Sequence, residues 1–278
     1  MRLPRPIRIL LVMLCVIGGA IAAAHAQQIW AGGYGGRTPP RFPTATTFSG
    51  GFNFCRAMFI SDRREKQGWG TDYPGADNNF SVRLAELTRV HIKLDETRQP
   101  HHVVVPLSDP LLTRCPMVFM TDIETAQFTP AEAQGLREFL LKGGFLWVDD
   151  SWGSRAWNNW LQQIGRVLPP QEYPLVDIDR RHPIMRTLYD VPNIPQVPNI
   201  GFWARSGGET SERGYDSAQV YFRGIHDAEG RLMVLISHNT DIADTWEREG
   251  EEPRSFFDTF SPRGYAIGVN VVIYAMSH

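Results

Sequence analysis

The chain has 278 residues, with 28 lysines and arginines, 30 acidic residues and a formal net charge of −2 at pH 7. This balance gives no support for a nucleic-acid partner, because phosphate binding needs a clustered positive field. The length suits one large domain or two small ones, with ample material for a core.

The first 26 residues have the three parts of a secretory signal peptide: a positive segment, a short apolar core and a small-residue cleavage site. These parts are Arg2, Arg5 and Arg8, then Ile9–Ile17, then Ala24-His25-Ala26. A membrane anchor is the alternative, but the apolar run is shorter than the roughly 20 residues that a spanning helix needs. We therefore expect cleavage after Ala26 and a soluble protein, periplasmic or otherwise exported, with no membrane span after cleavage.

Residues 27–52 are rich in glycine and proline and show neither helical nor strand periodicity. The glycine-rich stretch 31–36 neither follows a predicted strand nor opens a helix, and a phosphate-binding loop requires both. We expect a flexible arm here and no bound nucleotide.

From residue 53 onward, short apolar runs alternate with segments of helical periodicity, which predicts one α/β domain over residues 53–278. Thr129-Pro130-Ala131-Glu132 combines an N-cap, a proline at the first helical position and the glutamate of a capping box. Continuous apolar strands between amphipathic helices are typical of a doubly wound, mostly parallel sheet flanked by helices. The predicted strands of this part are 55–60, 103–105, 117–120 and 145–148, with a further helix near 80–87.

The second half of the chain predicts a β-hairpin and leaves the C-terminal segment open. Residues 218–225 and 231–237 flank Asp227-Ala-Glu-Gly230, which is typical of a hairpin turn. The C-terminal segment has apolar residues at helical spacing, although 271–274 also fits a strand.

Two cysteines follow the signal segment, Cys55 and Cys115, and each opens an apolar run. If the two runs are neighbouring parallel strands in matching register, the sulfurs can approach bonding distance in an oxidising compartment. Bridges across adjacent strands are often poorly shaped, so two buried free thiols are the favoured interpretation and the disulfide is the alternative.

A first polar cluster follows the predicted strand that ends at Val148, and it consists of Asp149, Asp150, Ser151 and Trp152. Ligands of open parallel sheets collect beyond the carboxyl ends of the strands, so this cluster is a candidate ligand-binding site. Adjacent residues of a strand point to opposite faces, so we expect one of the two aspartates to face the cleft. The alternative is a strand end and helix cap without function.

A second polar cluster follows the hairpin strand that ends near residue 237. Its candidate ligand-binding residues are His238, Asn239, Asp241, Asp244, Trp246 and Glu247. Such a group can bind a hard cation through oxygen, position a water or hold a polar ligand, while the alternative is a solvated loop held by Asx turns. His238 could also serve as a base for Ser151 if the fold brings the two together.

Four segments carry a family resemblance, namely Lys142–Asp150, Arg181–Ile184, Ile194–Ile200 and Leu235–Ile242 with Trp246-Glu247. Together, over residues 53–278, they resemble a bacterial family known as domain of unknown function 4159, for which no reaction is established. The resemblance implies a fold similar to class I glutamine amidotransferases, which is flavodoxin-like. The cysteine nucleophile of those enzymes would fall near Asp150 or Ser151, where this chain has no cysteine. Glutamine hydrolysis by the covalent route is therefore not expected.

The leading functional hypothesis is a non-amidotransferase relative of that fold that binds a polar ligand, such as a glycan or another cell-envelope component. The first alternative is a hydrolase that uses the same carboxylates directly or through a divalent metal. The second is a scaffold for envelope assembly with a protein partner. These residues leave open whether any reaction is catalysed.

Overall fold

A seven-stranded mixed sheet in the order β2-β1-β3-β4-β7-β6-β5 forms the centre of the protein, in a computed structural model that describes residues 38–61 and 68–278. The first five strands of this order are parallel, and β6 and β5 are antiparallel to their neighbours. The strands are β1 (Phe54–Met58), β2 (His102–Pro106), β3 (Val118–Thr121), β4 (Leu146–Ser151), β5 (Leu175–Asp177), β6 (Tyr221–His226) and β7 (Leu232–His238).

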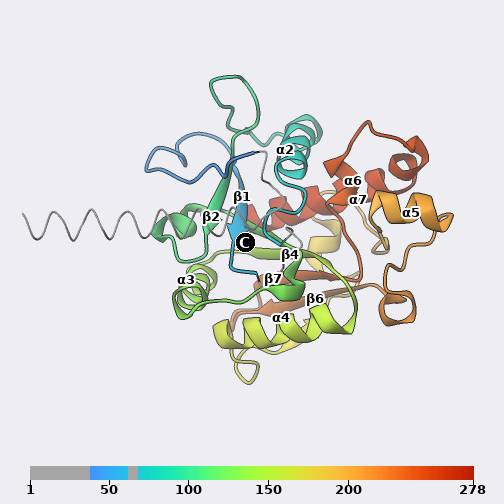
Figure 1. Cartoon of the computed structure of the whole chain (residues 1–278). Coiled ribbons are helices and arrows are strands. Elements are labelled where there is room, and N and C mark those ends of the chain that lie inside the picture. The colour runs from blue at the N-terminus through green and yellow to red at the C-terminus, as the bar shows by residue number, and fades with distance from the viewer. Residues whose placement is uncertain (1–37, 62–67) are drawn as a thin grey trace, which may run out of the picture.

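Helices lie on both sides of this sheet (Figure 1). They are α2 (Gly75–Leu87), α3 (Pro130–Leu141), α4 (Gly153–Val167), α5 (Ile200–Ser206), α6 (Asp244–Glu247) and α7 (Arg254–Ser277). Short 3-10 helices are η1 (Pro110–Arg114), η2 (Ile123–Thr125), η3 (Pro183–Arg186) and η4 (Gly214–Ser217). The predicted α/β class with a mostly parallel sheet is confirmed. The finer doubly wound, amidotransferase-like arrangement stays a prediction.

Successive side chains of the buried strands point to opposite faces of the sheet, so they form two separate hydrophobic cores. Val118 and Val148 pack with α3 and α4 on one face of the sheet. Phe119 and Trp147 pack with α2 and α7 on the other face. Both faces are therefore apolar, which is why these strands appear in the sequence as continuous hydrophobic runs.

The capping box and the hairpin turn predicted from the sequence are both present in the structure. The Thr129 hydroxyl accepts from the Glu132 amide at 3.2 Å, and the Glu132 carboxylate accepts from the Thr129 amide at 2.7 Å, which completes the capping box of α3. The hairpin is formed by β6 and β7. The C-terminal segment is the helix α7, not a strand, and its Gly264 allows close packing, because an added Cβ would lie 1.9 Å from the Thr245 hydroxyl.

Cys55 and Cys115 form a disulfide with a Cα–Cα distance of 6.1 Å, so the favoured interpretation of two free thiols is wrong. The premise of matching register is also wrong, because Cys55 lies opposite Val118. Cys115 lies three residues earlier, directly after η1, where the chain turns into β3. The bridge therefore joins β1 to a turn and does not cross two paired strand positions.

The described part of the predicted arm, residues 38–52, lies against the edge of the domain. Arg41 binds Asp95 at 3.0 Å, and its carbonyl accepts from the Val104 amide of β2. Phe52 forms a bridge with Ile92. The predicted signal peptide, residues 1–26, and the first part of the arm lie outside the described residues. No helix of the described chain is long and apolar enough to cross a bilayer.

Candidate functional site

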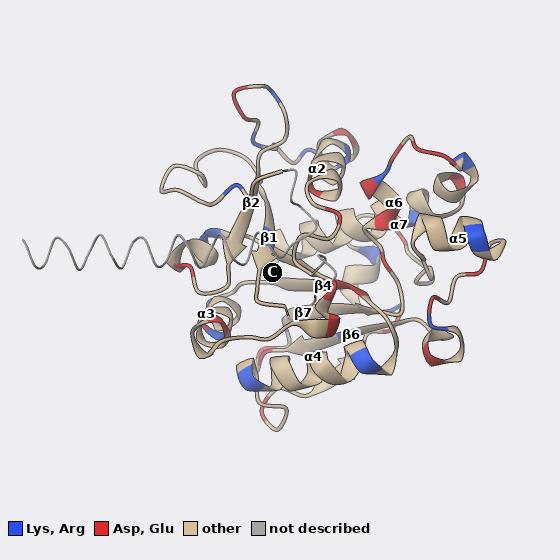
Figure 2. Cartoon of the chain, in the orientation of Figure 1, with Lys and Arg blue, Asp and Glu red and all other residues tan. Residues whose placement is uncertain are grey.

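The two predicted polar clusters lie side by side, because β4 and β7 are adjacent parallel strands that end together. Ser151 pairs with His238, and the Asn239 amide donates to the Ser151 carbonyl at 2.6 Å. Figure 2 shows acidic segments at the end of β4 and at α6, at the same edge of the sheet. The parallel sheet thus brings together residues about ninety positions apart.

A cavity of about 280 Å³ lies at this edge, and seven carboxylates of the described residues line it. Two guanidinium groups, of Arg213 and Arg248, also line it. The cavity is therefore rich in hydrogen-bond acceptors and in negative charge. The carboxylates belong to Asp72, Asp122, Glu124, Asp150, Glu212, Asp241 and Glu247.

Left-handed backbone at the strand ends turns the chain into this cavity. Asp122 directly follows β3 with φ 50°, Asp150 lies at the end of β4 with φ 50°, and Asn239 directly follows β7 with φ 64°. Asp72, in the loop before α2, has φ 63°. Aspartate and asparagine tolerate this region better than other non-glycine residues, and such positions concentrate at functional sites.

The two adjacent aspartates of β4 have different environments, as strand alternation predicts. Asp149 is fully buried and its Oδ2 accepts from the Ala243 amide at 2.9 Å. Burial raises the pKa of Asp149 to about 7. Asp150 faces the cavity and accepts from the Trp152 indole at 2.9 Å. Burial, followed by repulsion from Asp122 and Glu212, raises the pKa of Asp150 well above its usual value.

Ser151 and His238 do not form a nucleophile–base pair. The Ser151 hydroxyl is buried and has no hydrogen-bond partner. The Arg223 guanidinium donates to Nδ1 of His238 at 2.9 Å, which leaves Nε2 as the protonated nitrogen facing the Gly153 carbonyl at 3.3 Å. Burial lowers the pKa of His238 to about 4. His238 is therefore a neutral structural group, stacked on Trp157 with ring centroids 4.7 Å apart.

The remaining predicted residues divide between framework and cavity. Asn239 accepts from the Gly153 amide at 2.8 Å and donates to the Gln219 carbonyl at 2.7 Å, so it ties β7 to α4. Trp246 is fully buried against Phe80 and Trp147, and does not line the cavity. The structure places Trp152, Asp241 and Glu247 in the cavity wall.

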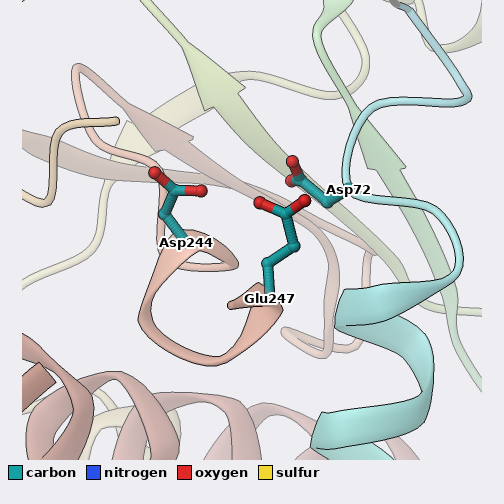
Figure 3. A group of neighbouring side chains, drawn as sticks. All are labelled: Asp72, Asp244 and Glu247. Atoms are coloured by element: carbon teal, nitrogen blue, oxygen red, sulfur yellow. The ribbon is translucent and has the colours of Figure 1, made fainter. Parts of the chain in front are cut away.

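Three acids of the described structure form a tight group: Asp72, Asp244 and Glu247 (Figure 3). One carboxylate oxygen of each lies within 4.8 Å of the others. Burial is the main cause that raises the pKa values of Asp72 and Asp244 well above normal, and repulsion from Glu247 adds to it. Oxygen ligands of this kind suit a hard divalent cation.

Sequence reasoning missed four of the seven cavity carboxylates: Asp72, Asp122, Glu124 in η2, and Glu212. Asp122 directly follows β3, so the strand-end rule that selected Asp150 could also have found it. Asp72 and Glu212 come from loops that no motif marks. Their place in the cavity depends on how those loops pack.

A search of the family models finds one match, Domain of unknown function (DUF4159), over residues 60–276. The chain belongs to this family. A search of the curated proteins finds no match.

Proposed function

We propose that this DUF4159 protein binds a polar ligand rich in hydroxyl or ammonium donors in the acidic cavity at the end of β4 and β7. The observation that carries the proposal is the cavity wall, where seven carboxylates of the described residues face two guanidinium groups. Ionised carboxylates only accept hydrogen bonds, so a complementary ligand supplies donors. Carboxylates held away from water are costly unless such donors or positive charge compensate them.

The ligand class that fits best is a glycan or another component of the cell envelope. The aromatic residues Trp152 and Tyr73 line a cavity whose charged groups are mainly carboxylates, and sugars offer both hydroxyls and an apolar ring face. We also propose that the protein is periplasmic or otherwise exported, which rests on the segment 1–26 and would bring it to such ligands.

The proposal includes a fold of the glutamine-amidotransferase type without that activity. The end of β4, near which those enzymes would carry their thiol, has Asp150 and Ser151. The two cysteines of the described residues are joined in a disulfide at β1. These features support a relative that has kept the sheet and changed the chemistry of its edge.

A thermal-shift screen of the chain without residues 1–26 tests the proposal, with neutral sugars, amino sugars and muropeptide fragments as ligands. A ligand that binds only the folded state raises the melting temperature by mass action. The shift should be lost in Asp150→Asn, which replaces a carboxyl group of the cavity by an amide at nearly constant volume. Asp258→Asn is the matched control, because this aspartate is 69% exposed on α7. Equal shifts in both variants would refute the proposed site.

A second candidate function, a carboxylate-dependent hydrolase, is favoured by one observation. Burial, followed by repulsion from Asp122, raises the pKa of Asp150 well above its usual value, which favours the protonated form that a general acid needs. Glu247 is a carboxylate of the same cavity that could act as the base. Release of product from a bound glycan, lost in Asp150→Asn while binding persists, would distinguish hydrolysis from binding alone.

A further inference from the structure

We infer that Asp72, Asp244 and Glu247 bind a divalent cation of the calcium type at the wall of the acidic cavity, which Asp72 and Glu247 line. This inference deepens the proposed function and rests on it for the role of the ion, which would help to hold a donor-rich ligand. Binding of the cation to these three carboxylates can, however, be tested with the metal ion alone, without the proposed ligand.

The three carboxylates come from two segments and point toward one another (Figure 3). Asp72 lies in the loop before α2, and Asp244 and Glu247 lie one turn apart on α6. Their oxygens lie within 4.8 Å of one another. Two oxygens on opposite sides of a Ca²⁺ ion are about 4.6–5.2 Å apart, twice the usual Ca–O distance, so one ion can contact all three groups.

An independent observation points to a missing partner at Asp72. Its Oδ2 is buried and accepts no hydrogen bond. Figure 3 shows this carboxylate directed at Glu247. A buried carboxylate oxygen without a donor is costly, and a cation between Asp72 and Glu247 would satisfy it.

Asp77 is a buried acid that has a buried base as its partner. Asp77 is fully buried on α2 and receives the Nε–H of Arg56 at 3.0 Å, and both side chains are 0% exposed. No comparable buried base contacts the triad among the described residues. Arg248 lies 3.4 Å from Glu247, but its side chain is 46% exposed and remains largely in water. The triad thus lacks the buried base that compensates Asp77.

Fixed contacts hold the two ligand-bearing segments together. The Arg56 guanidinium donates to the Thr71 carbonyl at 2.7 Å and to the Trp69 carbonyl at 3.3 Å, directly before Asp72. The Asn79 side-chain amide of α2 donates to the Glu247 carbonyl at 2.9 Å. Asp72 and Glu247 therefore approach each other through a preformed frame, which a cation site requires.

The chemistry of the group selects the kind of ion. All three donors are carboxylate oxygens, with no histidine or cysteine among them. Such a set favours Ca²⁺, Mg²⁺ or Mn²⁺ over Zn²⁺ or copper. Oxygens within 4.8 Å of one another can all reach a Ca²⁺ ion at its usual Ca–O distance of about 2.3–2.6 Å.

Isothermal titration of the EDTA-treated chain with CaCl₂, MnCl₂ and ZnCl₂ tests the inference. We expect saturable Ca²⁺ binding with a dissociation constant of about 10⁻³ M or tighter, the range of extracellular calcium modules. Asp72→Asn and Glu247→Gln should each weaken binding by at least roughly tenfold, comparable with losses around other metal sites. Asp258→Asn should bind like the wild type.

Melting temperatures measured without metal show whether a variant binds Ca²⁺ weakly because it lacks a coordinating carboxylate or because it is unfolded. Asp72→Asn and Glu247→Gln each remove mutual repulsion, so they should melt at or above the wild-type temperature. The inference would be overturned if neither Ca²⁺ nor Mn²⁺ showed saturable binding to the wild type. It would also be overturned if Asp72→Asn and Glu247→Gln were both folded and bound Ca²⁺ as tightly as the wild type. If a sugar raises the melting temperature in EDTA and Ca²⁺ shows no binding, the proposed ligand-binding function is retained and only the cation site is refuted. If Ca²⁺ binds but no sugar raises the melting temperature, the cation site is retained and the proposed ligand-binding function is refuted.

Discussion

The buried pair of Arg56 and Asp77 offers the sharpest test of how the framework supports the cavity. Both side chains are 0% exposed, and the guanidinium also donates to the carbonyls of Trp69 and Thr71. Arg56→Met would leave Asp77 buried without a partner and two carbonyls without donors. Breaking a buried ion pair costs about 3–5 kcal/mol, so we expect the unfolding free energy of Arg56→Met to fall by that amount.

The double variant Arg56→Met/Asp77→Leu separates stability from positioning. Replacing a buried ion pair by apolar side chains is often neutral or stabilising by about 1–4 kcal/mol, so most of the lost free energy should return. The donors to the loop before Asp72 do not return, so Ca²⁺ affinity should stay low. Urea unfolding and calcium titration of the same three proteins measure both effects. A single variant within about 1 kcal/mol of wild type would contradict the burial of the pair, because measured penalties are larger. A double variant with full Ca²⁺ affinity would refute the positioning role of Arg56.

Three further predictions concern stability. Cys55→Ser/Cys115→Ser opens a loop of 60 residues, so the unfolding free energy in urea should fall by roughly 4 kcal/mol, provided that chain entropy dominates. His238 has a pKa of about 4 in the folded protein, below its unfolded value, so its contribution to stability should fall as pH drops from about 6.5 toward 4, by up to about 3 kcal/mol. The difference in unfolding free energy between the wild type and His238→Asn should therefore change in that direction over this window, in urea titrations at several pH values. Gly264→Ala places a Cβ 1.9 Å from the Thr245 hydroxyl, and the resulting overpacking should lower stability by about 1–3 kcal/mol, read from the melting temperature.

Local features of the fold were predictable because they depend on residues a few positions apart. Thr129 and Glu132 form the capping box that their spacing predicts. The hairpin of β6 and β7 forms around the turn at Asp227. The C-terminal segment was ambiguous locally, and packing resolved it, since Gly264 of α7 fits closely against Thr245.

The candidate site was predictable in part, through the rule that ligands lie beyond the carboxyl ends of parallel strands. That rule selected Asp150 and Asp241, which line the cavity. It also selected Trp246, which the packing of α2 and α6 places in the core. Polar density in a sequence segment does not tell which side chains turn outward, because that depends on neighbours from other elements.

By itself, the sequence determined the class of fold, the capping box of α3 and the strand ends where polar residues gather, because short-range periodicity and capping control these features. Only the tertiary structure decided which acids share one cavity. The register of β4 against β7 joins the two predicted clusters, and the contacts of Arg56 and Asn79 bring Asp72 to Glu247. These contacts link residues far apart in the chain, so no local pattern records them.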